Sequence, residues 1–115
     1  MIILPVRKKW LGWLLSGKKQ EDYRDAKRYW DIRIIKWLGY PLSEKSSVKE
    51  LLSRMRAGLS RKVILQNGCG SNACLLKAVC SLSIGTCRSE WGAEPKMEYY
   101  RFHIKNISKS ISGKE

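Results

Sequence analysis

Apolar positions in the first half of the chain recur mainly at the three- and four-residue spacing of helices. This spacing predicts helices at residues 7–16, 26–38 and 47–58, the last of which opens with a Ser-Val-Lys-Glu capping box. Two short strands are predicted at residues 2–6 and 20–24. The residues expected to face inward from the helices are Trp10, Trp13, Leu14, Tyr29, Trp30, Ile34, Trp37, Leu38, Val48, Leu51, Leu52 and Met55.

The second half of the chain changes to the two-residue alternation of strands. Strands are predicted at residues 62–67, 73–84 and 99–107, joined by a turn at 68–72 and a loop at 85–98. Alternate residues of the last strand are expected to be buried, namely Tyr100, Phe102 and Ile104. Helices early and strands late in so short a chain predict an α+β fold, a small mixed β-barrel with two or three helices packed on it.

The length of 115 residues suits one domain. We expect this domain to span residues 1–107 and a polar tail to follow at residues 108–115. The net charge is +13, and residues 1–62 hold 16 basic and 6 acidic side chains, so most of the excess charge lies in the first half. A field of this sign attracts polyanions, of which nucleic acid is the commonest. RNA or a nucleotide is therefore the expected partner.

No apolar run approaches the ~20 residues that a membrane-spanning helix needs. The first residues place apolar side chains before basic ones, the reverse of a secretory signal, so we expect a cytoplasmic protein without a membrane partner. The four cysteines do not have the paired spacing of zinc sites, and we expect free thiols, no metal and no cofactor. Cys74 and Cys80 are expected to be buried on a strand, and Cys69 and Cys87 to lie in loops.

The segment that begins at Gly17 carries the strongest chemical signal. Gly17 can adopt the left-handed conformation that ends a helix. On the extended segment that follows, Asp22 and Arg24 are expected to point to one side, with Tyr23 packed inward. Lys19 can fold over the side of Asp22 and Arg24 from the preceding turn. A lysine, a carboxylate and a guanidinium that converge in this way form an anion or nucleotide site; the alternative is a solvated charged turn.

The stretch from Leu15 to Arg24 resembles the G-x-K-x-x-E-x-R signature of ASCH domains (activating signal cointegrator homology), which belong to the PUA-like β-barrels. Further matches follow in the order found in the small phage and bacterial members: Ile3-Leu4-Pro5-Val6, Lys27-Arg28-Tyr29-Trp30, Ser83-Ile84-Gly85-Thr86, Glu90-Trp91-Gly92-Ala93-Glu94-Pro95 and Glu98-Tyr99-Tyr100. The resemblance implies a barrel with a cleft beside the signature turn and RNA or nucleotide ligands. Asp22 departs from the signature, because it stands where the family has Glu and its carboxylate is one methylene shorter.

RNA binding without catalysis requires cations for phosphates and aromatic rings for bases. Arg24 can make a bidentate contact to a phosphate or a base edge, and Trp91 can stack on an unpaired base. The residues expected to bind nucleic acid are Lys8, Lys9, Lys18, Lys19, Arg24, Lys27, Arg28, Arg33 and Trp91. We expect Lys19→Ala and Arg24→Ala to weaken binding and to leave the fold intact.

Two enzymatic activities stay open, because some ASCH proteins are metal-independent ribonucleases and others remove an acyl group from cytidine. The catalytic candidates are Lys19, Asp22 and Arg24, with Glu90 or Glu94 as a more distant carboxylate. For a ribonuclease, two neighbouring cations make Asp22 a weak base, and the single histidine, His103, is expected to be a solvated strand residue. For an amidohydrolase, the family members with this activity have Thr at the Asp22 position, so Asp22 is expected to orient a water instead, and Lys19 beside Asp22 is expected to keep its proton.

A protein-directed role is a further alternative. A small basic protein of phage type can bind an acidic host factor and block it through charge and shape. A salt-sensitive complex with one acidic protein and no affinity for RNA indicates this role. Affinity for many RNAs that falls steeply with salt indicates phosphate contacts instead.

Overall fold

The structure, a computed structural model, describes residues 2–40, 48–54, 60–68 and 73–108. Several positions named above lie outside these residues: Ser47 of the capping box, Met55, the turn at residues 69–72 with Cys69, the tail from residue 109, and the side chain of Leu52. No helix in the described part of the chain is long and apolar enough to cross a membrane.

Nine elements follow one another within the described ranges. In chain order they are β1 (Ile2–Pro5), α1 (Lys8–Ser16), β2 (Glu21–Asp25), α2 (Arg28–Trp37), α3 (Val48–Arg54), β3 (Arg61–Asn67), β4 (Cys74–Thr86), the short 3₁₀ turn η2 (Ser89–Trp91) and β5 (Glu98–Lys105). The three helices and five strands predicted from the hydrophobic pattern are therefore confirmed. The loop expected at residues 85–98 contains η2.

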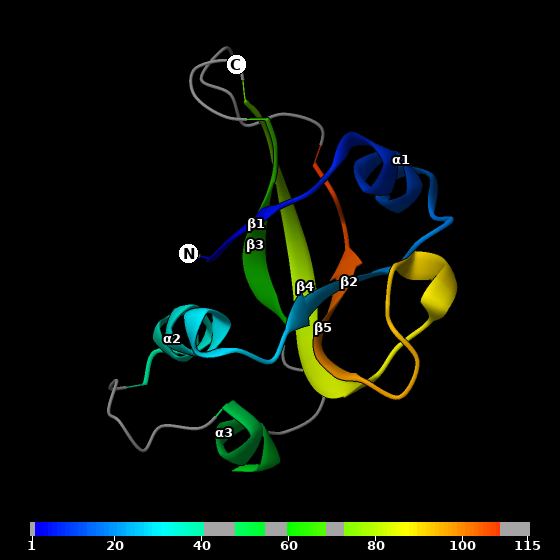
Figure 1. Cartoon of the computed structure of the whole chain (residues 1–115). Coiled ribbons are helices and arrows are strands. Elements are labelled where there is room, and N and C mark those ends of the chain that lie inside the picture. The colour runs from blue at the N-terminus through cyan, green and yellow to red at the C-terminus, as the bar shows by residue number, and fades with distance from the viewer. Residues whose placement is uncertain (1, 41–47, 55–59, 69–72, 109–115) are drawn as a thin grey trace.

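The five strands form one sheet in the order β1-β3-β4-β5-β2. β1 runs parallel to β3, and the other three pairs are antiparallel. The sheet curls into a half-barrel, with α1 and the turn η2 near one end and α2 with α3 at the other (Figure 1). The predicted α+β barrel-like fold is confirmed. β1 and β2 are the two edges of the sheet, although each comes from the N-terminal quarter of the chain.

One face of the sheet and the inner sides of the helices make the core. Alternation places every second residue of β5 in this core, and Phe102 is fully buried with its ring centroid 5.8 Å from that of Trp37. Leu11 and Leu14 reach the core from α1, and Ile34 from α2. The remaining buried apolar residues come mainly from the strands: Ile2, Leu4, Val63, Leu65, Leu76, Ala78, Cys80, Tyr100 and Ile104.

Some expectations about burial are wrong. Tyr29 was expected to face inward, but it is 54% exposed, because it lies on the outer side of α2. Cys74 is exposed although it shares the face of the buried Cys80, since it pairs with Asn67 at the far end of the β3–β4 ladder. The four helical tryptophans are half-buried, and Trp10, Trp30 and Trp37 pack against the rim of the core, which agrees with the inward direction expected for them.

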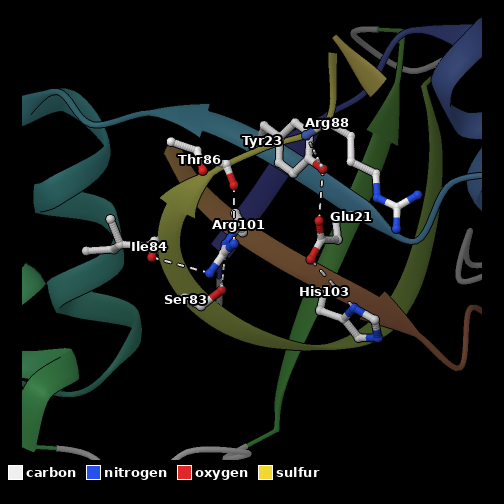
Figure 2. Close-up of polar contacts among 8 residues, drawn as sticks. All are labelled: Glu21, Tyr23, Ser83, Ile84, Thr86, Arg88, Arg101 and His103. Carbon is white, nitrogen blue, oxygen red and sulfur yellow. Dashed lines mark hydrogen bonds and ion pairs between the residues drawn. The ribbon is translucent and has the colours of Figure 1, made fainter. Parts of the chain in front are cut away.

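The curl of β4 is held by a side chain from β5. Arg101 donates from Nε to Oγ of Ser83 at 3.0 Å, and from Nη1 and Nη2 to the carbonyl oxygens of Thr86 and Ile84, both at 3.3 Å (Figure 2). The guanidinium lies flat on Gly85, where an added Cβ would stand 2.9 Å from Cζ of Arg101. The absence of a side chain at Gly85 therefore lets Arg101 bond to three residues of the same stretch of β4, Ser83, Ile84 and Thr86.

A second polar group lies on the same outer face of the sheet. The hydroxyl of Tyr23 donates to Oε1 of Glu21 at 2.8 Å, and Nδ1 of His103 lies 4.0 Å from Oε2 of Glu21 (Figure 2). His103 is about half exposed, as expected for a solvated strand residue. This face carries these polar side chains, whereas the helices that the structure describes pack against the opposite face.

Replacement of Phe102 by Ala should test the core directly. The variant is expected to lose about 3–5 kcal/mol of unfolding free energy, because a fully buried ring leaves a cavity. Urea denaturation of wild type and variant measures the difference. Ile3→Ala on β1 is the control: Ile3 is 46% exposed, and its loss should cost about 0.5 kcal/mol or less. Equal effects for the two variants would contradict the assignment of the core.

Candidate functional site

A pocket of about 360 Å³ lies where the turn between α1 and β2 meets the loop that contains η2. Its lining is mainly polar, in contrast to the core beneath it. The charged side chains that line it are the cations Arg7, Lys19 and Arg24 and the acids Asp22, Asp25 and Glu94. The pocket therefore joins the predicted signature turn to the predicted loop.

Backbone geometry directs Lys19 into this pocket. Gly17 has φ of 81° and ends α1 in the left-handed conformation, as the sequence predicted, and its N–H donates to the carbonyl of Leu14. The N–H of Lys19 then donates to the carbonyl of Trp13 at 3.0 Å. These bonds fold the turn back over α1, so that the Lys19 side chain points away from solvent.

Lys19 is a buried cation, with only 3% of its surface exposed. Its Nζ donates to the carbonyl oxygen of Trp91 at 3.2 Å and lies 4.2 Å from the ring centroid of Trp10. Burial lowers the pKa of Lys19, an effect that outweighs the opposing attraction of Asp22 and is reinforced by repulsion from Arg24. Asp22 raises the pKa of Lys19, as expected for a neighbouring carboxylate, but the larger effect of burial gives a net decrease.

Asp22 and Arg24 form an ion pair on the same side of β2, as predicted. Nε of Arg24 donates to Oδ2 of Asp22 at 2.7 Å, and the two side chains are 16% and 7% exposed, respectively. Nη2 of Arg24 also donates to the carbonyl of Pro5, the last residue of β1. Its Cζ lies 5.0 Å from the ring centroid of Trp30. Arg24 thus links the two edge strands of the sheet while it lines the pocket.

Aromatic rings also line the pocket. Tyr23 was expected to pack inward, but it lies on the outer face of β2, where its ring centroid is 6.4 Å from Trp91 and 6.0 Å from Tyr99. Burial and the hydrogen bond to Glu21 raise the pKa of Tyr23, so its hydroxyl stays protonated at neutral pH. The hydroxyl of Tyr99 accepts the N–H of Glu94 at 2.9 Å, which fixes the loop against β5.

The structure brings together only part of the predicted set. Lys19, Asp22, Arg24 and Trp91 line one pocket. Glu90 does not: its side chain is 63% exposed and its Oε1 lies 3.9 Å from Nη1 of Arg88, because η2 turns it away from the pocket. Glu94 lines the pocket in its place. The other predicted nucleic-acid contacts lie outside the pocket and are exposed: Lys8, Lys9, Lys18, Lys27, Arg28 and Arg33.

Sequence reasoning missed several residues of the lining, among them Arg7, Trp10, Asp25 and Tyr99. Arg7 stands at the start of α1 and Trp10 one turn later, Asp25 ends β2, and Tyr99 begins the buried part of β5. Arg7, Lys8 and Lys9 crowd the N-terminus of α1, where the helix dipole disfavours cations, and this pattern is a signal that an anion belongs nearby. Nothing in the pattern distinguished Trp10 from a core tryptophan.

The site offers hydrogen-bond donors, carboxylate acceptors and flat apolar surfaces. Among the residues that the structure describes, no three His, Cys, Asp or Glu side chains are grouped to hold a metal ion. Lys19 and Arg24 present positive charge, and Asp22 presents oxygen, around a space bordered by Trp10 and Trp91. Such a lining suits a planar polar ligand that carries or adjoins negative charge.

Comparison with protein-family models, with curated proteins and with solved structures finds no match to this chain.

The burial of Lys19 should produce a specific pH dependence of stability. Because the pKa of Lys19 is lower in the folded chain, the unfolded chain binds more protons between that value and the ordinary 10.5. The unfolding free energy of wild type should therefore rise relative to that of Lys19→Met as the pH increases through this window. Urea denaturation at several pH values measures the difference. Lys18→Met is the control for loss of one exposed charge, and a wild-type advantage that does not change with pH would contradict the prediction.

The contact of Arg24 with Pro5 and Asp22 changes the expectation for Arg24→Ala. This variant should lose about 3–5 kcal/mol of unfolding free energy, because it leaves the Asp22 carboxylate buried without its partner. The double variant that also carries Asp22→Ala should recover part of this loss. Urea denaturation of the two single variants and the double variant gives the coupling free energy, and additive effects would show that the pair contributes nothing to stability.

Proposed function

We propose that the chain is an RNA- or nucleotide-binding protein of the ASCH type, and that the pocket between the signature turn and the η2 loop receives a base or nucleotide. The observation that carries the proposal is the arrangement of Lys19, Asp22 and Arg24 within one pocket that Trp91 also lines. A base has a polar edge and two apolar faces. The pocket offers charged groups and aromatic rings to match both.

The polar edge of a base would contact the charged side chains of the pocket, Lys19, Asp22 and Arg24. Asp22 supplies carboxylate oxygens that accept from an exocyclic amine, and the Arg24 guanidinium holds Asp22 in place at 2.7 Å. Lys19 is fixed between Trp10 and the carbonyl of Trp91, so it presents its charge without loss of side-chain freedom on binding. This preorganisation favours a ligand that combines an acceptor with a negative charge.

Phosphates adjoining the base would meet exposed cations. Lys8 and Lys9 lie on the first turn of α1, and Lys18 lies in the turn beside Lys19. Nζ of Lys18 and Nζ of Lys9 lie 4.1 Å and 5.2 Å from the ring centroid of Trp13, so the aromatic ring sits among cations. The net charge of +13 adds long-range attraction for an anionic strand.

A hydrolase is the second candidate, and the burial of Lys19 favours it. A lysine whose pKa is lowered by desolvation is better able to accept a proton than an exposed lysine. Glu94 lines the same pocket and supplies the more distant carboxylate that an amidohydrolase requires. Cleavage of RNA and removal of an acyl group from a modified cytidine both remain activities to test at this site.

Binding of a fluorescein-labelled single-stranded RNA of random sequence, followed by anisotropy, tests the main proposal. Affinity should fall with salt with a log–log slope steeper than about −2, which corresponds to roughly three phosphate contacts. Lys19→Met should weaken binding about 10-fold or more, the loss expected for one charge-assisted contact. Lys105→Met removes an exposed charge from β5 outside the pocket and should change affinity less than about threefold.

The same samples separate the alternatives. Intact RNA on a denaturing gel in the presence of chelator, with binding retained, supports binding without cleavage. Cleavage by wild type that Lys19→Met abolishes supports the ribonuclease. Release of free acid from an N-acylated cytidine supports the amidohydrolase. Wild type that binds neither RNA nor a mononucleotide, even at low salt, would contradict the proposal and leave an acidic protein as the partner to test.

A further inference from the structure

The outer side of α2 carries an exposed aromatic ring, that of Tyr29, with the guanidinium of Arg33 stacked on it. Cζ of Arg33 lies 3.6 Å from the ring centroid of the exposed Tyr29, and Nη1 of Arg33 donates to the carbonyl of Tyr29 at 3.2 Å. The bond and the ring contact hold the planar guanidinium over the tyrosine. A stacked pair of this kind presents a flat, charged surface of the sort on which unpaired bases stack.

This surface is connected to the pocket by direct ring contacts. Arg24 lines the pocket, and its Cζ lies 5.0 Å from the ring centroid of Trp30. The ring of Trp30 meets the ring of Tyr29 edge to face, with centroids 5.2 Å apart. An unbroken series of cation and aromatic groups therefore runs from the pocket onto α2.

The series continues to a second hollow. Arg33 lines a pocket of about 340 Å³ together with Lys36 and Trp37 of α2 and with Ile2 and Ile3 of β1. Most of its surface is apolar, and its cations come from the helix. Nε1 of Trp37 donates to the carbonyl of Lys62 at 2.8 Å, which fixes the indole at the edge of this hollow.

Charge on α2 favours an anionic ligand along this line. The cationic residues on or before the helix are exposed: Lys27, Arg28, Arg33 and Lys36. The acidic residue of α2, Asp31, accepts a hydrogen bond from the hydroxyl of Tyr100 and is turned toward the sheet. The outward charge of the helix is thus positive over its length of about 15 Å.

We propose that the ligand is a single-stranded RNA segment, one of whose bases occupies the pocket at Lys19 while the following nucleotides cross Trp30 and Tyr29 toward the hollow at Trp37. This inference rests on the proposed function and adds its substrate class. Double-stranded RNA does not fit, because its bases are paired and cannot stack on Tyr29. A free nucleotide fills the pocket only and leaves α2 unused.

Comparison of ligands of different length tests the inference. Binding of cytidine and uridine monophosphates is followed by tryptophan fluorescence, and binding of a labelled ten-nucleotide RNA by anisotropy. Tyr29→Ala should weaken binding of the ten-nucleotide RNA about fivefold or more, the smallest effect of one lost base–aromatic stack, and should leave mononucleotide binding unchanged. Tyr29→Phe keeps the ring and should bind like wild type. A duplex of the same sequence should compete poorly.

The outcomes for the inference and for the proposed function are distinguishable. Unchanged RNA affinity in Tyr29→Ala, with mononucleotide binding sensitive to Lys19→Met, overturns the path along α2 and keeps the pocket. Duplex RNA that competes as well as the single strand also overturns the inference. Absence of binding to every RNA and mononucleotide overturns both. Tyr29 is exposed, so its replacement tests the surface without removing part of the core.

Discussion

The buried ion pair between Asp22 and Arg24 is the constraint on which the sheet edge and the pocket both depend. Burial of two charges is costly, and it is tolerated where each group is fully engaged. Here Arg24 satisfies Asp22 with one nitrogen and the carbonyl of Pro5 with another, so it joins β2 to β1 across the open side of the half-barrel. The same guanidinium borders the pocket and contacts Trp30. The contact that joins the two edge strands is therefore also part of the pocket lining, and loss of Arg24 would disturb both.

The parts of this arrangement that depend on local geometry could be predicted from the sequence. Gly17 predicts the end of α1, because glycine is the residue that most readily adopts the left-handed conformation found there. The two-residue period of a strand places Asp22 and Arg24 on one side of β2, and this placement does not depend on how other segments pack. The alternation in β5 identified the residues that enter the core, Tyr100, Phe102 and Ile104, for the same reason. Each of these inferences needs only the backbone of one element.

The parts that depend on packing between distant segments could not be predicted. Tyr29 has the spacing of an inward residue, but the rotation of α2 about its axis is decided by what Ile34 and Ile35 bury. Glu90 and Glu94 are both acids of the same loop, and the sequence does not distinguish them as pocket residues. The turn η2 directs Glu90 to solvent and leaves Glu94 in the lining. The depth at which Lys19 is buried depends on the loop 72 residues away, and so does the direction in which its pKa moves.

The strand order has a consequence for how the chain reaches this state. β2 is made early, but it pairs with β5, which is the last strand to be synthesised. Until β5 exists, Asp22 and Arg24 sit on a segment with no neighbour in the sheet, beside an edge that is exposed to other chains. β3 and β4, which are adjacent in sequence, can pair without them. β1 can pair with β3 once β3 has been made. We therefore expect the β3–β4 hairpin to form before the pocket, and β2 to stay unpaired until β5 emerges.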